Sequence, residues 1–242
     1  MSSLKQVTDI NISDSHWHWL YRMAGMSALV TAVLIIAQMI VFILWPPPNT
    51  AIDYFNLFQE NALLGFLALD LLYVIDNVLL IPILLALYVA LRKTNESFMA
   101  IGAALGLVGI ASLFASNPAA NMHFLSEQFA TATETQRSLL LAAGDAMLAV
   151  YSGTAYHMSL ILGSVALVII SVVMLQSEIF SKATAYMGIL ANVLALGLYV
   201  PKVGIYILFF SVVFLLVWYI LITLRLLRLG QSISKEDARK NH

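Results

Sequence analysis

Two carboxylates interrupt an otherwise apolar stretch of the chain, residues 62–91. A charged side chain at the centre of a bilayer costs about 2.5–3.5 kcal/mol on insertion scales, so a retained carboxylate is a functional-site hypothesis. Asp70, Tyr73 and Asn77 are spaced three and four residues apart, which places them on one face of a helix. Asp76 points about 100° away from Asn77. A carboxylate here that gains and loses a proton would suit a proton-coupled carrier.

Further polar groups lie in the apolar stretches nearer the C-terminus. The candidates there for ligand or proton binding are Asp145, His157, Asn192 and Lys202, and Tyr151 and Tyr156 are further polar residues of the segment that holds Asp145 and His157. Counting residues inward from the expected membrane surface places Asp70 and several of these groups toward the outer half of the bilayer. We therefore expect a polar cavity open to the outer face. In it, Lys202 or His157 would pair with one of the two carboxylates of residues 62–91.

A purely structural interpretation stands beside each candidate. Asn and Tyr side chains in membrane helices commonly hydrogen-bond to neighbouring helices, which would account for Tyr73, Asn77, Tyr156 and Asn192. Asp145 would face water if its segment leaves the membrane. His157 would have a structural role in helix packing. Lys202 would extend its ammonium group to the membrane–water interface.

The sequence carries no motif for a metal or an organic cofactor. It has no cysteine, which excludes thiolate metal sites, iron–sulfur clusters and cysteine nucleophiles. It also lacks a Gly-rich phosphate loop and the HExxH pair of zinc peptidases. His16 and His18 flank Trp17, but no third ligand is near them in the sequence. We predict no metal, haem or flavin, and the net charge of −1 gives no reason to expect a nucleic-acid partner.

Composition places these groups in a helical membrane protein. Of the 242 residues, 61% are hydrophobic and 10% are charged, and the mean hydropathy is +0.90. A soluble domain carries about 25% charged residues. The predicted fold class is therefore all-α, a polytopic bundle of about six transmembrane helices. We expect them at 23–45, 62–91, 98–116, 155–175, 183–199 and 203–227, within one domain, 23–228, flanked by an interfacial segment, 1–22, and a polar tail, 229–242.

The fourth apolar segment, residues 138–175, is too long for one crossing. As a single helix it would extend about 57 Å, against about 30 Å of hydrocarbon. Ser152 and Gly153 are weak helix formers near its middle, so we predict a break there. The sequence leaves open whether residues 138–154 span the membrane, re-enter it or protrude from it.

Lysine and arginine are distributed unevenly between the two sides that six spans define. Ten of the twelve fall on the side of the termini, and only Arg137 and Lys202 fall on the other. Positive residues favour the cytoplasmic side of a membrane. Both termini are therefore predicted to be cytoplasmic, in a multi-pass protein of the cell membrane.

Gly102 and Gly106 form a GxxxG pair within residues 98–116. This spacing lets two helix backbones approach closely in lipid, so it predicts a helix–helix contact and offers a site for a partner helix. The other expected partners are the lipid bilayer and a small-molecule or lipid ligand.

Five stretches carry a family likeness. They are YRMAG at 21–25, LALYVALRK at 85–93, AAGDAMLAVYSGTAYHMSLILG at 142–163, FSKATAYMGILANVLALGLYVPKVG at 180–204 and VWYILITLRLLRLG at 217–230. Over about residues 20–230 the chain resembles a bacterial family of integral membrane proteins known as domain of unknown function 4386. The resemblance implies a single multi-span membrane domain. It implies no activity and no functional residues.

Three classes of function fit these observations. A transport or small-ligand-binding protein would use the polar groups of residues 62–91, 138–175 and 183–199 to line a cavity. An intramembrane enzyme acting on a lipid would need Asp, His and Lys side chains within hydrogen-bond reach of one another. A structural or regulatory subunit would have no cavity and would expose the face of Gly102 and Gly106. We favour transport or ligand binding, and we expect a non-enzymatic role.

Overall fold

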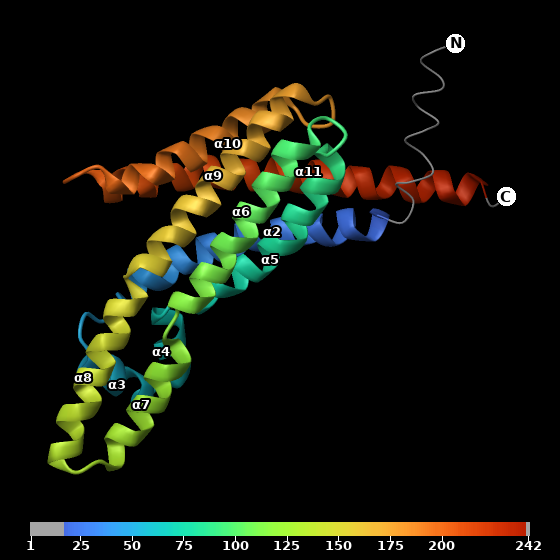
Figure 1. Cartoon of the computed structure of the whole chain (residues 1–242). Coiled ribbons are helices and arrows are strands. Elements are labelled where there is room, and N and C mark those ends of the chain that lie inside the picture. Colours follow the sequence, from blue (N-terminus) through green and yellow to red (C-terminus); the bar gives the residue numbers. More distant parts are fainter. Residues whose placement is uncertain (1–16, 241–242) are drawn as a thin grey trace. The chain divides into compact units, whose positions relative to one another are not determined.

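The chain folds into helices alone over the part that the structure describes. The computed structural model covers the backbone of residues 17–240 and the side chains of residues 17–232. The predicted segment 1–22 therefore lies mostly outside the described residues. The helices are α2 (His18–Leu44), α3 (Ala51–Glu60), α4 (Ala62–Ala68), α5 (Leu71–Leu91), α6 (Glu96–Ser116), α7 (Ala119–Thr131), α8 (Glu134–Tyr151), α9 (Thr154–Gln176), α10 (Lys182–Ala195), η2 (Leu196–Tyr199) and α11 (Gly204–Lys240) (Figure 1). This confirms the all-α prediction.

Five helical stretches are long and apolar enough to cross a membrane, one fewer than predicted. They are His18–Leu44, Leu71–Leu91, Glu96–Thr131, Glu134–Gln176 and Gly204–Ser232. The missing one is residues 183–199, where α10 has 14 residues and is followed by the four-residue 3₁₀ helix η2. Fourteen residues rise about 21 Å, which is short of about 30 Å of hydrocarbon.

The predicted break in the fourth apolar segment is confirmed. α8 ends at Tyr151 and α9 begins at Thr154, with Ser152 as the C-cap of α8. At the break, the amide of Gly153 donates to the carbonyl of Val150 at 3.0 Å. A Cβ on Gly153 would lie 2.9 Å from the carbonyl oxygen of Ala149, so only glycine fits this turn without a shift.

The predicted continuous helix over residues 62–91 is wrong, because the chain breaks at Leu69 and Asp70. Asp70 has φ 62, a left-handed backbone conformation that ends a right-handed helix. α4 therefore stops at Ala68 and α5 starts anew at Leu71. Pro82 lies inside α5 and does not interrupt it.

Contacts between helices divide the chain into two compact units. Unit 1 consists of Met1–Ala32, Leu79–Gly106 and Ser164–His242. Its core includes Trp218, Ile170 and Leu87, all of them fully buried. α10 and α11 pack closely in this unit, since a Cβ on Gly188 would lie 2.6 Å from the indole nitrogen of Trp218.

The GxxxG pair makes a close contact inside unit 1. A Cβ on Gly102 would lie 3.0 Å from Ile170, and one on Gly106 would lie 2.8 Å from Leu84 and 3.6 Å from the Cβ of Ala166. Both glycines are buried. The helix–helix contact that the spacing predicts is therefore formed with α9 and α5 of the same chain.

Unit 2 consists of Val33–Val78 and Leu107–Gly163, and its centre is a cluster of four helices, α3, α4, α7 and α8, which we name the cap. The interior of the cap is apolar and aromatic. Its buried side chains are Ala51, Tyr54, Phe55, Phe58, Ala68, Leu69, Ala119 and Met122. A side-chain hydrogen bond adds to this packing, because Gln59 of α3 donates to the carbonyl of Ser126 on α7 at 3.0 Å.

The aromatic side chains of α3 form the centre of the cap. Tyr54, Phe55 and Phe58 are 3%, 0% and 3% exposed. Together with Ala51 they follow the i, i+3, i+4, i+7 spacing of an amphipathic helix. The polar connector at 117–137 is also mostly helical, because it contains α7.

The packing of α8 on α3 depends on Gly144, and this gives a stability prediction. A Cβ on Gly144 would lie 2.8 Å from the Cβ of Ala51 and 2.9 Å from Phe55. We expect Gly144→Ala to lower the free energy of unfolding by about 1–3 kcal/mol, as overpacking does elsewhere. Thermal unfolding of the purified protein in mild detergent measures the change.

Gly163→Ala is the matched control, because it is a helical glycine of the same unit with nothing within 4 Å of its added Cβ. Alanine is the better helix former by about 1 kcal/mol, so this variant should be as stable as the wild type or more stable. Equal behaviour of the two variants would contradict the packing described for Gly144.

Candidate functional site

Three helix interruptions of unit 2 are joined by side-chain hydrogen bonds. Asn117, between α6 and α7, donates its amide to the carbonyl of Leu69 at 2.7 Å. Its carbonyl oxygen accepts from the amide of Ala119 at 3.0 Å and so starts α7. Tyr151, the last residue of α8, donates its hydroxyl to the carboxylate of Asp70. We name these four residues, Leu69, Asp70, Asn117 and Tyr151, the junction.

Asp70 holds a backbone conformation that few residues other than glycine adopt. Its φ of 62 lies in the left-handed region, which costs an ordinary side chain roughly 1–2 kcal/mol and asparagine or aspartate less. Its amide donates to the carbonyl of Leu67 at 3.3 Å, and its carbonyl accepts from the amide of Val74 at 2.9 Å. Strained residues of this kind concentrate at functional sites, where the surrounding structure holds them in place.

Tyrosines of two further elements interact with the Asp70 carboxylate, and a third lies next to Tyr151. Tyr54 of α3 is buried, and burial together with the negative charge of Asp70 raises its pKa to about 12. Tyr73 of α5 interacts electrostatically with Asp70 and with Tyr156 of α9. The rings of Tyr151 and Tyr156 have centroids 6.4 Å apart. We name Tyr54, Tyr73, Tyr151 and Tyr156 the tyrosine cluster.

Burial and hydrogen bonding act on Asp70 in opposite directions. Burial raises the pKa of Asp70 above its usual value, and the hydrogen bond from Tyr151 lowers it in part. The raised pKa reflects the larger effect, which is desolvation of the charged form. The carboxylate is half-buried, so it keeps access to protons and to a ligand.

Unit 2 is strongly acidic. It holds seven carboxylates, of Asp53, Glu60, Asp70, Asp76, Glu127, Glu134 and Asp145, and one Lys or Arg, Arg137. The guanidinium of Arg137 lies over the ring of Phe129 at 5.2 Å from its centroid, near the turn between α7 and α8. Arg137 belongs to the first turn of α8 and Tyr151 to its last, so this cation is separated from the Asp70 carboxylate by the length of the helix.

The other predicted site residues fall in both units. Asp76 of α5 is buried and interacts electrostatically with Tyr73. The Asn77 amide donates to the carbonyl of Tyr73 at 2.9 Å, within its own helix. Asp145 is exposed on α8. The ring of His157 packs near that of Tyr156, with centroids 5.6 Å apart.

Asn192 and Lys202 belong to unit 1. Asn192 is buried, and its amide donates to the carbonyl of Gly188 at 2.8 Å, again within its own helix. Lys202 is exposed in the turn before α11 and has φ 69, a left-handed backbone. The hydrogen-bond partner of Asp70 is thus a tyrosine, in place of the basic side chains expected from the sequence.

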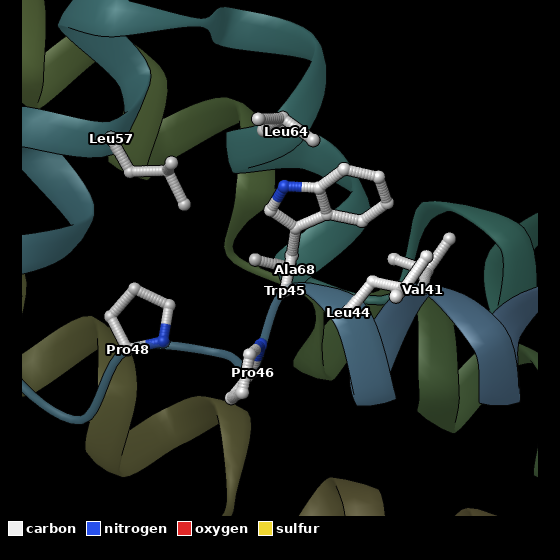
Figure 2. A pocket seen from close by; sticks show the side chains of 8 residues that line it. All are labelled: Val41, Leu44, Trp45, Pro46, Pro48, Leu57, Leu64 and Ala68. Atoms are coloured by element: carbon white, nitrogen blue, oxygen red, sulfur yellow. The ribbon is translucent and has the colours of Figure 1, made fainter.

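A cavity of about 250 Å³ lies in unit 2, beside the end of α2. It is lined by Val41, Leu44, Trp45, Pro46, Pro48, Leu57, Leu64 and Ala68. Figure 2 shows Trp45 among these side chains, with Leu64 and Ala68 of α4 close to its ring. Its lining is apolar, so it is not the polar cavity expected from the sequence. Ala68 lines it, and the junction residues Leu69 and Asp70 follow Ala68 directly in the chain.

Sequence reasoning singled out Asp70 and missed most of its surroundings. Tyr151 was noted only as a polar residue of its segment, and neither Tyr54 nor Asn117 was a candidate. A usable signal was present, since Asn117 precedes a proline and Tyr151 directly precedes the predicted break at Ser152. Both signals mark helix ends. Placing these helix ends at the same depth as Asp70 would have predicted that Asn117 and Tyr151 lie close to it.

The hydrogen bond between Tyr151 and Asp70 gives a prediction on stability and its pH dependence. Because the pKa of Asp70 is raised in the folded state, its protonated form favours folding, and this stability is lost as pH rises through the folded pKa. Tyr151→Phe removes the donor that stabilises the ionised form. We expect a loss of about 1.5–3 kcal/mol at neutral pH that shrinks as pH falls, measured by thermal unfolding between pH 4 and pH 8.

Tyr206→Phe is the control, because Tyr206 is 72% exposed in α11 and should leave stability unchanged at every pH. In the Asp70→Asn background, Tyr151→Phe should have a smaller effect that does not vary with pH. A loss that is equally large at both ends of the pH range would contradict the role given to the ionised carboxylate.

Comparison with known proteins supplies no template for this site. No family model, no curated protein and no solved structure matches the chain. The structure alone shows an all-helical protein over its described residues, with five helical stretches long and apolar enough to span a membrane. The role of the junction is therefore argued from its own geometry and charge.

Proposed function

We propose that the chain is a multi-pass protein of a cell membrane, with both termini in the cytoplasm and the cap on the outer side. Two observations support this orientation. The stretches Glu96–Thr131 and Glu134–Gln176 have 36 and 43 residues, more than the roughly 20 that one crossing needs, and their surplus forms α7 and α8. Unit 2 also carries Arg137 as its one Lys or Arg, as the positive-inside rule expects of an outer segment. This arrangement needs an even number of crossings, so α10 and η2 would make the sixth one together, with a combined rise of about 29 Å for their 14 and four residues.

The absence of cysteine from the chain makes this orientation testable. Glu127→Cys places a thiol on an exposed position of α7, and Lys93→Cys places one in the exposed turn between α5 and α6. In intact cells, a membrane-impermeant maleimide should label the first variant and leave the second unlabelled. Permeabilised cells should label both, which controls for reactivity, and the reverse pattern in intact cells would overturn the orientation.

We infer that the cap and its junction bind a small ligand, as part of transport or of ligand recognition at the outer face. The observation that carries this function is the half-buried carboxylate of Asp70, held in a left-handed conformation and hydrogen-bonded by Tyr151. A buried ionisable group at such a site is a functional candidate. The cavity lined in part by Leu64 and Ala68 of α4, two residues before Asp70 in the chain at its nearest, provides volume for a ligand.

Two other classes receive less support from the described residues. An enzyme acting on a lipid would need a base or nucleophile aligned with the carboxylates, but Asp145 is exposed on α8 and the partner of Asp70 is a tyrosine. A structural subunit would expose the face of Gly102 and Gly106, and that face is buried within unit 1.

Native mass spectrometry tests ligand binding even while the ligand is unidentified. Protein purified in mild detergent from its own membrane should carry a bound small molecule, whereas Asp70→Asn should carry about tenfold less, as expected when a hydrogen-bonded charged contact is lost. Asp145→Asn removes an exposed carboxylate of the same unit and should retain the ligand. A wild-type protein that carries no small molecule would contradict the proposed function, as would equal occupancy in Asp70→Asn.

A further inference from the structure

Charge narrows the class of ligand that unit 2 can accept. Seven carboxylates face one arginine in this unit, and Arg137 is at the opposite end of α8 from Tyr151. An anionic ligand would meet repulsion from most of this surface, while a cationic ligand would be attracted to it. The field of unit 2 therefore favours a positively charged ligand.

The side chains near Asp70 favour an organic cation over a metal ion. Among the described residues, no group of three or more His, Asp or Glu side chains is arranged to hold a metal. Asp70 instead has tyrosines around it, since Tyr54, Tyr73 and Tyr151 each interact with its charge. A carboxylate beside aromatic rings is the chemistry that recognises alkylammonium groups, where each cation–π contact contributes about 0.5–2 kcal/mol.

The cavity indicates that this cation carries an alkyl group. Its eight lining residues are apolar, and its volume of about 250 Å³ is below the roughly 300–1,000 Å³ of pockets for drug-sized ligands. It suits one short chain. Leu44, which lines the cavity, is 59% exposed, and Ile40 and Ile43 of the same helix are 51% and 74% exposed, so the surface of α2 beside the cavity is apolar.

We propose that the ligand is an amphiphilic organic cation, with its alkyl group in the cavity beside Trp45 and its ammonium group at the Asp70 carboxylate and the tyrosine cluster. The proposal rests on the ligand-binding function proposed above and names the chemical class of that ligand. α4 makes it geometrically feasible, because Leu64 and Ala68 line the cavity and Asp70 follows two residues later. One molecule with a charged head and a short tail would occupy both places.

Three probes of equal chain length separate charge from hydrophobicity. Hexyltrimethylammonium, hexanol and hexanoate are titrated calorimetrically into the full-length protein in phosphatidylcholine nanodiscs, with empty nanodiscs subtracted. We expect the cation to bind at least about tenfold more tightly than hexanol, and hexanoate to bind most weakly. This order is a property of the wild type, so it does not depend on how well any variant folds.

Two variants and one control assign the contributions to the two places. Asp70→Asn should remove the advantage of the cation and leave hexanol binding unchanged, while Asp145→Asn should preserve the full order. Leu64→Trp fills the cavity and should abolish binding of all three probes, with folding of each variant checked by thermal unfolding.

The outcomes separate this proposal from the proposed function. Equal affinity for the cation and hexanol, a preference for hexanoate, or binding of none of the probes would overturn the amphiphilic cation. So would an anionic molecule found on the protein purified from its own membrane, although that finding would support ligand binding itself. If Asp70→Asn still prefers the cation, the ammonium group of the probe binds at a site other than Asp70. That result would also overturn the proposal.

Discussion

The hydrogen bond from Tyr151 to Asp70 is the contact on which the organisation of unit 2 depends. It joins residues that are 81 positions apart in the chain. Tyr151 ends α8, and Asp70 lies between α4 and α5. On one side it stabilises the left-handed turn that separates α4 from α5, and on the other it fixes where α8 ends. Asn117 adds a third tie through the Leu69 carbonyl. With these interruptions joined, α3, α4, α7 and α8 can pack as one apolar cluster around Phe55 and Met122.

The sequence predicts the fold class and most helix positions because both depend on local properties. Apolar runs of membrane length are visible in composition, and the break at Ser152 and Gly153 follows from helix length and weak helix propensity. The break at Asp70 was not predictable in the same way, since an aspartate inside an apolar run leaves the backbone free to continue as a helix. The cap was missed for another reason: the helical spacing of Ala51, Tyr54, Phe55 and Phe58 is present, but three prolines and two acidic residues around it suggested a loop.

The candidate site was only partly predictable. Asp70 was identified from the energetic penalty of a carboxylate among apolar residues, and that argument needs no structure. Charge complementarity suggested Lys202 or His157 as the partner of Asp70 or Asp76, whereas the hydrogen-bond donor to Asp70 is an uncharged phenol; a pairing of Asp76 stays a prediction. Asn77 and Asn192 donate to carbonyls four residues back in their own helices, so their spacing on the helix face carries no information about a site. The membership in domain of unknown function 4386 stays a prediction from the sequence.

The acidic surface of unit 2 has a consequence for the solution that the site meets. Its exposed charges are five carboxylates and one arginine, an excess of four negative charges, which draws protons and other cations toward the surface and raises their local concentration above that of the bulk. This ion atmosphere extends over a Debye length of about 10 Å at 0.1 M salt. Asp70 therefore titrates in a layer more acidic than the surrounding medium, and added salt dissipates that layer. The ionic strength of the solution around unit 2 thus becomes a variable that affects the charge state of Asp70.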